Sequence, residues 1–303
     1  MIRVKCKTLE AYYSYINSNP KELDLFFNRF SINYTYFFRN WDLFERLNNI
    51  IIECFNYRNN TLFYDFKPDP SKIKKKNKNE QKNRKKVNKT SNKGISSKRL
   101  DSNRYLVQNK YYVKETSLYK KINNPKLNNN SIKIWSCPCA TGEEPYTIAM
   151  ILNNLEKQIK SFPQYKIVAS DIDKTAIDKA HKAVYNDDSV KETSKYFESR
   201  YFSKENEYFG NKYILTEDIK RKVDFFCEDI TKGHQNRWKY DIILCRYLLI
   251  YFNRENRDSF LKIIDRHLEL GGLLILGKTE TLFNNYSNFK LVDARNHIYL
   301  KIR

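Results

Sequence analysis

The stretch from residue 134 to residue 146 constrains the fold more than any other part of the chain. An apolar segment runs into a tight loop with one glycine, Gly142, and two carboxylates then open a segment with apolar residues at helical spacing. A second strand-like run, residues 165–171, follows and ends on Asp171. Strand, loop, helix, strand and terminal acid predict one half of a nucleoside-binding α/β sheet.

In such a sheet the loop binds the charged end of a cofactor and the acid binds ribose hydroxyls. The chain lacks the G-x-G-x-x-G fingerprint and any phosphate-binding lysine loop. A cofactor with ribose but no phosphate fits better, and S-adenosylmethionine is the common one. Glu144 suits the ammonium of a methionyl group, and Asp171 suits ribose. Taken singly, both could equally stabilise helix N-termini.

The positive charge is concentrated in one segment. The formal net charge is +21, and residues 66–130 carry 20 Lys or Arg and 4 Asp or Glu, which leaves the rest of the chain only mildly basic. Because this segment has few large apolar groups, we expect a solvated, flexible insert. Electrostatic docking to an anionic membrane face, nucleic acid or an acidic protein is the alternative.

The cysteine pattern does not predict bridges or a metal site. Cys227 and Cys245 follow apolar runs and are expected to be buried. Cys137 and Cys139 are too close for easy disulfide geometry, and no second pair completes a zinc pattern. Without an apolar signal region or a run of ~20 apolar residues, the chain is expected to be reduced and cytoplasmic.

Three segments are expected along the chain. Residues 1–57 read as helices, 58–130 as the basic linker or insert, and 131–303 as the α/β domain. Alternating strands and helices predict a parallel sheet, with late strands near 287–291 and 297–302 as an antiparallel edge.

Two glycine-containing pairs give more local predictions. Gly210-Asn211 predicts a hairpin turn. Gly271-Gly272 is expected to link a helix to a strand over 273–277.

Residues 31–40, Ser-Ile-Asn-Tyr-Thr-Tyr-Phe-Phe-Arg-Asn, mix aromatic and polar groups. On spacing alone, we expect a turn whose aromatic side chains fill the core between the N-terminal helices, with Arg39 in solvent.

Several motifs in order resemble the CheR-type chemoreceptor methyltransferases, which are S-adenosylmethionine-dependent protein-glutamate O-methyltransferases. The resemblance covers about 8–57 and 131–303. The motifs are Ile-Asn-Tyr-Thr-Tyr-Phe-Phe-Arg at 32–39, Trp-Ser-x-x-x-x-Thr-Gly-Glu-Glu-Pro-Tyr at 135–146, Ala-Ser-Asp-Ile-Asp at 169–173, Cys-Arg-x-x-x-Ile-Tyr-Phe at 245–252 and Gly-Gly-Leu-Leu-x-Leu-Gly at 271–277.

The resemblance implies an all-α N-terminal domain on a class I (Rossmann-like) methyltransferase sheet, with a small antiparallel β subdomain around 195–222 that helps to engage chemoreceptors. Implied catalytic residues are Arg39 and Tyr251. Implied cofactor contacts are Asn33, Thr35, Arg39, Glu144, Asp171, Asp229, Ile230, Arg246 and its neighbour Tyr247. Tyr247 stands where the family usually has Asn, and would either stack on adenine or obstruct it.

The implied chemistry is physically reasonable. A glutamate carboxylate has a reference pKa near ~4.3 and is already a nucleophile at neutral pH, so transfer needs in-line placement more than a strong base. Arg39 can hold a carboxylate through its planar fork, and Tyr251 can donate a second hydrogen bond. Two alternatives stay open. They are a cofactor-binding scaffold without activity and a nucleic-acid methyltransferase, although the chain has no Asn/Asp-Pro-Pro-aromatic motif.

Overall fold

The computed structural model describes residues 6, 8–23, 26, 35–59, 131–159, 161–208, 210–235, 237–282 and 286–303. The basic segment 66–130 and Asn33 lie outside the described residues. Within the described part, none of the helices is both long and apolar enough to cross a membrane.

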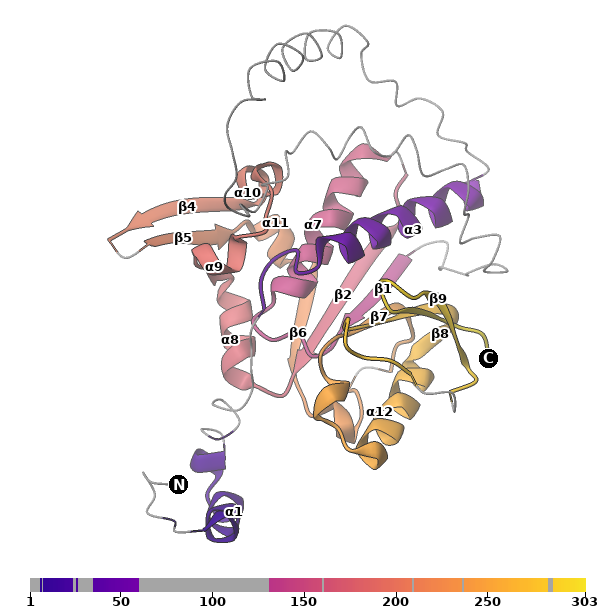
Figure 1. The fold of residues 1–303 in the computed structure, drawn as a ribbon. Coiled ribbons are helices and arrows are strands. Elements are labelled where there is room, and N and C mark those ends of the chain that lie inside the picture. The colour runs from indigo at the N-terminus through magenta and orange to yellow at the C-terminus, as the bar shows by residue number, and fades with distance from the viewer. Residues whose placement is uncertain are drawn as a thin grey trace, which may run out of the picture.

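A seven-stranded sheet forms the centre of the α/β domain (Figure 1). Its spatial order is β6-β2-β1-β7-β8-β10-β9. The pairs from β6 to β8 are parallel, whereas β10 pairs antiparallel with both β8 and β9. The strands are β1 Ser131–Ser136, β2 Gln164–Asp171, β6 Val223–Cys227, β7 Tyr240–Cys245, β8 Leu268–Leu276, β9 Phe289–Asp293 and β10 Ile298–Lys301. The predicted fold class, including the antiparallel edge, is confirmed.

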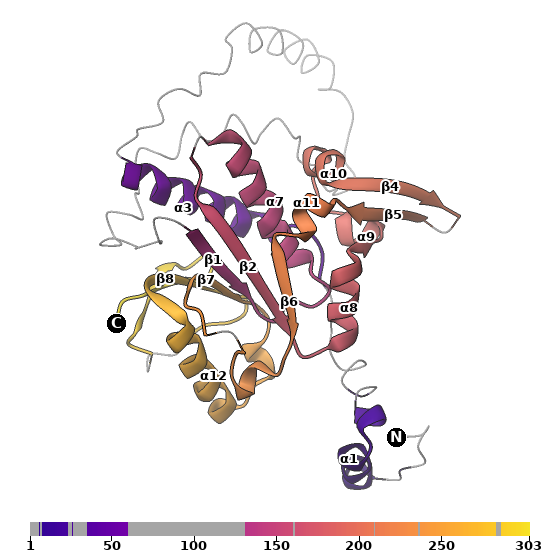
Figure 2. The same cartoon turned by 180° about the vertical axis from the view of Figure 1, so that it is seen from behind.

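Helices cover both faces of this sheet (Figures 1 and 2). Helix α7 (Glu143–Gln158) and helix α8 (Lys174–Lys182) pack on one face, and α12 (Arg254–His267) packs on the other. Helix α3 (Trp41–Asn59) lies outside α7. Two apolar clusters separated by the sheet form the core, because strands buried on both faces need apolar side chains on both.

A second, three-stranded antiparallel sheet projects from the α7–α8 side (Figure 1). It contains β3 (Val184–Tyr185), β4 (Phe202–Glu207) and β5 (Gly210–Leu215), in the order β3-β5-β4. The accompanying short helices are α9 (Asp187–Val190), α10 (Lys195–Tyr201) and α11 (Glu217–Lys220).

The predicted turn at Gly210-Asn211 is wrong in its position. Glu207 pairs with Gly210 and Asn206 with Asn211, so both residues of the predicted turn lie in the paired strands. Asn211 belongs to β5, where its backbone N–H and side-chain amide donate to Asp187 at 2.9 and 2.8 Å. These bonds hold Asn211 in β5, which begins at Gly210.

Two other expectations are also wrong. Gly271 and Gly272 lie inside β8, next to a register shift between β7 and β8, and Gly271 has φ +81°, as glycines at strand irregularities often do. Cys227 is exposed, because it is the last residue of an edge strand, whereas Cys245 is buried as expected. Cys137, Cys139, Cys227 and Cys245 are free thiols.

The aromatic turn before α3 packs on the α/β domain. Phe37 and Phe38 are fully buried. The ring of Phe37 contacts Tyr185 and Phe202 of the small sheet, at 4.7 and 5.1 Å between centroids. Phe38 contacts Phe197 of α10 at 4.7 Å. The expectation that these aromatics fill a core of N-terminal helices is met only in part. Phe38 also contacts Trp41 and Phe44 of α3, at 5.0 and 6.3 Å, whereas helix α1 (Leu9–Ser18) lies away from the turn (Figure 1).

Candidate functional site

The candidate site lies at the carboxyl ends of β1, β2 and β7. The chain leaves β1 toward β2 on one side, and β7 pairs with β1 on the other, so this is the topological switch point where α/β sheets bind ligands. The loop after β1 ends at Gly142, which has φ +92° and precedes α7. A Cβ on Gly142 would lie 2.9 Å from Cβ of Ala180, so the loop packs against α8 too closely for a side chain.

Asp171 ties this loop to the end of β2. Its two carboxylate oxygens accept the N–H of Ala140 at 2.8 Å and that of Asp173 at 3.0 Å. The side chain is buried, and burial raises the pKa of Asp171 although these two N–H groups oppose the shift. Each oxygen keeps lone pairs for a further donor.

The two carboxylates that open α7 have different surroundings. Glu144 accepts a hydrogen bond from the hydroxyl of Ser136 at 2.8 Å and forms an ion pair with Arg246 at 2.7 Å. Glu143 accepts from the hydroxyls of Thr141 at 2.6 Å and Ser189 at 3.2 Å, and its pKa is raised by burial. Glu144 faces the sheet edge, whereas Glu143 links the loop to α9.

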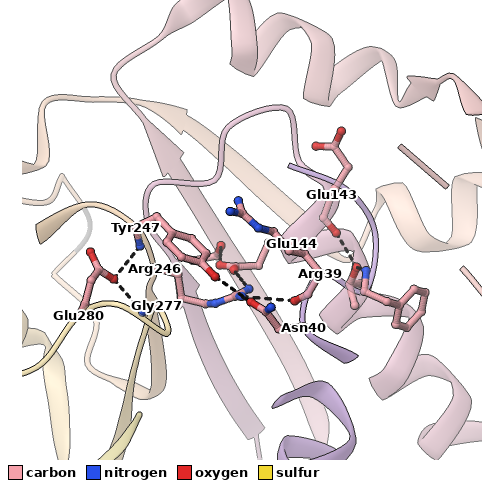
Figure 3. A network of polar contacts seen from close by, with 11 residues as sticks. Arg39, Asn40, Glu143, Glu144, Arg246, Tyr247, Gly277 and Glu280 are labelled. Carbon is pink, nitrogen blue, oxygen red and sulfur yellow. Dashed lines mark hydrogen bonds and ion pairs between the residues drawn. The ribbon is translucent and has the colours of Figure 1, made fainter. Parts of the chain in front are cut away.

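Arg246, directly after β7, joins the sheet to the N-terminal segment (Figure 3). Besides its bond to Glu144, its Nη2 donates to the side-chain oxygen of Asn40 at 2.5 Å and to the carbonyl of Arg39 at 3.3 Å. The guanidinium is buried, and its Nε has no hydrogen-bond partner among the described residues.

Tyr247 also reaches the N-terminal segment. Its hydroxyl donates to the side-chain oxygen of Asn40 at 2.8 Å, and the guanidinium carbon of Arg39 lies 4.1 Å from its ring centroid. Figure 3 shows Arg39 and Tyr247 side by side, beside the Arg246–Glu144 pair. The expectation that Arg39 is simply in solvent is wrong, because its side chain is half-buried against this ring.

The turn that carries Arg39 is strongly constrained. Phe38 and Asn40, on either side of it, have φ +60° and +67°, a region that residues other than glycine rarely adopt. The N–H of Phe37 donates to the carbonyl of Ser189 at 2.8 Å, and that of Phe38 to the hydroxyl of Thr147 at 3.1 Å. These contacts place Arg39 opposite the end of β7.

The remaining predicted residues are dispersed around this centre. Thr35 is half-buried, just before the turn. Asp229 precedes the 3₁₀ helix η3 (Ile230–Lys232) at the end of β6. Its carboxylate accepts from the N–H and hydroxyl of Thr231 at 3.1 and 2.6 Å, and Ile230 is buried. Burial alone would raise the pKa of Asp229, but hydrogen bonds from Thr231 and Lys232 lower it.

Tyr251 ends the 3₁₀ helix η4 (Leu249–Tyr251) and its side chain is 60% exposed. In the described part of the chain, the hydrogen-bonded group around Arg246 does not include Tyr251. Tyr251 follows the same strand as Arg246 and Tyr247, so it belongs to the same edge of the sheet.

Sequence reasoning missed three residues of the site. Asn40 accepts from both Arg246 and Tyr247. Glu280 accepts backbone N–H groups at the ends of β7 and β8. Glu228, just before Asp229, is 2.5 Å from Nδ1 of the buried His234, whose ring stacks on Trp135 at 4.1 Å. Asn40 is the last residue of the aromatic stretch, and Glu228 directly precedes the predicted contact Asp229. Their positions next to predicted site residues were the signal in the sequence that could have identified these two.

The residues of the site fit the charge distribution of S-adenosylmethionine. Glu144 and Asp171 supply carboxylate oxygens with lone pairs to spare, for an ammonium group and for ribose hydroxyls. The unpartnered Nε of Arg246 supplies a buried donor of the kind that a carboxylate accepts.

Sequence comparison identifies relatives over the same region. A family model described as the CheR methyltransferase SAM-binding domain matches residues 102–298. A chemotaxis protein methyltransferase from Borreliella burgdorferi is 30% identical over 186 residues, covering 58% of this chain and 65% of the relative. Chemotaxis protein methyltransferase 1 from Vibrio cholerae is 29% identical over 177 residues, covering 58% and 64%. The matches thus span just under two thirds of these relatives' length.

Among solved structures, a glycopeptide N-methyltransferase complexed with sinefungin superposes with a TM-score of 0.32 at 9% identity, covering 52% of this chain and 45% of that one. That overlap is too small to bear on the site. The family match covers more than half of the chain and includes the loop at 137–142, Asp171 and Arg246. The chain therefore belongs to the CheR methyltransferase family, and this region contains the S-adenosylmethionine-binding domain of that family.

Proposed function

We propose that this protein transfers a methyl group from S-adenosylmethionine to glutamate side chains in the cytoplasmic domains of chemoreceptors, forming glutamyl methyl esters. The observation that carries the proposal is the position of Arg39. It is held by a buried, strained turn directly beside the Arg246–Glu144 ion pair, at the edge where Asp171 and the 137–142 loop lie. The names of the relatives, chemotaxis protein methyltransferases, support the same function.

The proposed reaction needs little proton chemistry. When bound, S-adenosylmethionine supplies the methyl group: a carboxylate oxygen bonds to its carbon as the carbon–sulfur bond breaks, and the electron pair stays on sulfur. The acceptor glutamate is ionised at neutral pH, with a reference pKa near ~4.3, and carries the nucleophilic electron pair itself. The contribution of the protein is therefore placement and exclusion of water.

Arg39 is proposed to direct the acceptor carboxylate. A guanidinium stays charged and presents parallel N–H donors, so it fixes both the position and the plane of a carboxylate. The Arg39 guanidinium carbon lies over the Tyr247 ring, so the ring limits the directions that the N–H groups can take. The exposed Tyr251 is proposed to donate a second hydrogen bond to the incoming group.

Glu144 and Asp171 are proposed to bind the two ends of the cofactor. Glu144 would accept from the methionyl ammonium, and Asp171 from the ribose hydroxyls. Asp229 and Ile230, which follow the neighbouring strand β6, are proposed to border the adenine, with Asn33 and Thr35 contributing from the N-terminal segment. Arg246 would hold Glu144 in place and offer its buried Nε to a carboxylate.

Transfer of tritium from labelled S-adenosylmethionine tests the function. Incubation with receptor cytoplasmic fragments should give protein-bound label that base releases as methanol, because methyl esters are base-labile. Label on nucleic acid would support the nucleic-acid methyltransferase instead. Cofactor binding without transfer to any acceptor would support a signalling scaffold. A matched receptor fragment in which Gln replaces the acceptor Glu residues is the control and should take up no label.

A further inference from the structure

Tyr247, which follows Arg246 after the end of β7, has an unusual backbone conformation. Tyr247 has φ +62°, in the left-handed region, which L side chains rarely adopt. Its ring faces the guanidinium of Arg39, and its hydroxyl donates to Asn40. Strain of this kind persists only where the surroundings determine the conformation strongly.

Glu280 holds the backbone of Tyr247 in this conformation. It is 3% exposed, and its Oε2 accepts the N–H of Tyr247 and that of Gly277, each at 2.7 Å. Its Oε1 accepts the N–H of Leu249 at 2.7 Å. One buried carboxylate thus joins the segment after β7 to the end of β8, as Figure 3 shows for Tyr247 and Gly277. Bonds from N–H groups to an ionised acceptor are stronger than neutral ones.

Gly277, at the end of β8, packs closely against both Glu280 and Tyr247. A Cβ added to Gly277 would lie 2.7 Å from Oε2 of Glu280, 2.9 Å from Cδ1 of Tyr247 and 3.0 Å from its nitrogen. The Tyr247 backbone, Glu280 and the end of β8 are therefore in close contact. A side chain at position 277 would therefore displace Glu280 or Tyr247.

We propose that Tyr247, anchored by Glu280, is a positioning residue that fixes the direction of the Arg39 guanidinium. Arg39 has a long side chain with several rotatable bonds, so a fixed backbone alone does not set the direction of its guanidinium. The ring of Tyr36 in the same turn lies farther from the guanidinium carbon than the Tyr247 ring does, at 5.9 Å. Stacking at 4.1 Å sets the plane of the guanidinium, and the hydrogen bond to Asn40 prevents the ring from turning away. This differs from both sequence-based expectations for Tyr247, stacking on adenine and obstructing it. This positioning role of Tyr247 rests on the function proposed above for Arg39.

Two substitutions at position 247 separate the ring from the hydroxyl. Tyr247→Phe keeps the ring but loses the bond to Asn40, so it should lower the transfer rate only partly, whereas Tyr247→Leu removes the ring altogether. Misplacing a reacting group by about 1 Å can cost on the order of a hundredfold in rate, so Tyr247→Leu should lower kcat on a receptor fragment by about tenfold or more. The Kd for S-adenosylhomocysteine, measured by calorimetry, should change by less than about threefold, because the ring acts on Arg39.

An NMR readout tests the stack independently of the acceptor. In arginine-labelled protein, the Arg39 Nε–Hε signal, assigned by its loss in Arg39→Lys, should carry a ring-current shift. The shift should persist in Tyr247→Phe and vanish in Tyr247→Leu. Glu280→Gln, which replaces an acceptor oxygen with an amide donor facing N–H groups, should move the signal toward the Tyr247→Leu value.

Trp238→Leu is the matched control. It removes another aromatic ring with a cation beside it, Lys133 at 5.3 Å from the ring centroid, before the amino end of β7. It should leave the Arg39 signal and kcat unchanged. An Arg39 signal unaffected by Tyr247→Leu would overturn the proposal, as would a loss of cofactor affinity as large as the loss of rate. If the wild-type protein methylates no receptor, the proposed function fails, and the NMR experiment still decides whether Tyr247 positions Arg39.

Discussion

Arg246 and Glu144 form an ion pair of 2.7 Å between the end of β7 and the first turn of α7, with side chains 4% and 12% exposed. Breaking a buried pair leaves one charge without compensation and typically costs about 3–5 kcal/mol, whereas removing both charges costs far less. Arg246→Met should therefore lower the free energy of unfolding in urea by about 3 kcal/mol, and the double variant with Glu144→Gln should regain part of it.

The matched control for this pair is Lys166–Asp224, which is 2.6 Å apart but 38% and 43% exposed. Lys166→Met should change stability by less than about 1 kcal/mol, because exposed pairs contribute little. Equal losses in Arg246→Met and Lys166→Met would show that burial does not govern the Arg246–Glu144 interaction.

Asp171 should make cofactor binding sensitive to acid. Burial raises the pKa of Asp171 above its ordinary value, so this carboxyl takes up a proton at a higher pH than an exposed aspartate does. The ionised form is the one that accepts ribose hydroxyls with both oxygens. Affinity for S-adenosylhomocysteine should therefore fall as pH drops, starting above the range where ordinary aspartates titrate.

Asp171→Asn removes this titration. Calorimetry should show affinity lowered by about tenfold at neutral pH, because a charged acceptor is lost, and little further loss on acidification. A wild-type affinity that stays constant down to the pH of acid unfolding would exclude Asp171 as a ribose ligand.

Much of the α/β domain was predictable because its strands are local and strongly patterned. Parallel strands buried on both faces read as continuous apolar runs, and Asp171 stands directly at the end of one. The loop at 137–142 was recognisable because Gly142 and the paired acids occupy consecutive positions. The errors were also local in origin. Gly271 was read as a connection, although it lies inside a strand at a register shift.

The contacts around Arg39 were not predictable, because they join residues that are distant in sequence. Asn40 and Tyr247 are 207 positions apart, and the sequence carries no pattern that pairs them. Glu280 is a single acid without a motif, and its role depends on N–H groups that converge only in the folded chain. The resemblance could name Arg39 and Tyr247 separately, but it treated Tyr247 as a cofactor contact.

Arg39→Ala should slow transfer more than it weakens cofactor binding. Loss of the fork leaves the acceptor carboxylate without direction, so kcat on a receptor fragment should fall by about tenfold to a hundredfold. The Kd for S-adenosylhomocysteine should change little. Arg39→Lys keeps the charge but not the planar fork, and should recover only part of the rate. Full turnover in Arg39→Ala would refute the assigned role.

The basic segment 66–130 is expected to act through long-range electrostatics. Deleting it should lower the rate of receptor methylation at low salt, because steering by clustered charge speeds encounter. The difference should disappear near 0.5 M salt, where charges farther apart than about 4–5 Å are screened. Equal rates for both proteins at low and moderate salt would show that the segment does not dock to the receptor.

Phe37 should couple the stability of the N-terminal turn to catalysis. Its fully buried ring packs between Tyr185 and Phe202, three residues before Asn40. Phe37→Ala should lower the free energy of unfolding by about 3–5 kcal/mol through the cavity that it leaves. It should also slow transfer under conditions where the protein is still folded, because the turn that carries Arg39 loses its anchor.

Phe260→Ala is the matched control, since Phe260 is equally buried but lies on α12, on the opposite face of the sheet. It should destabilise the protein to a similar extent without a comparable loss of kcat in the folded state. Equal losses of kcat in the two variants, measured well below their melting temperatures, would show that Phe37 acts through general stability and not through Arg39.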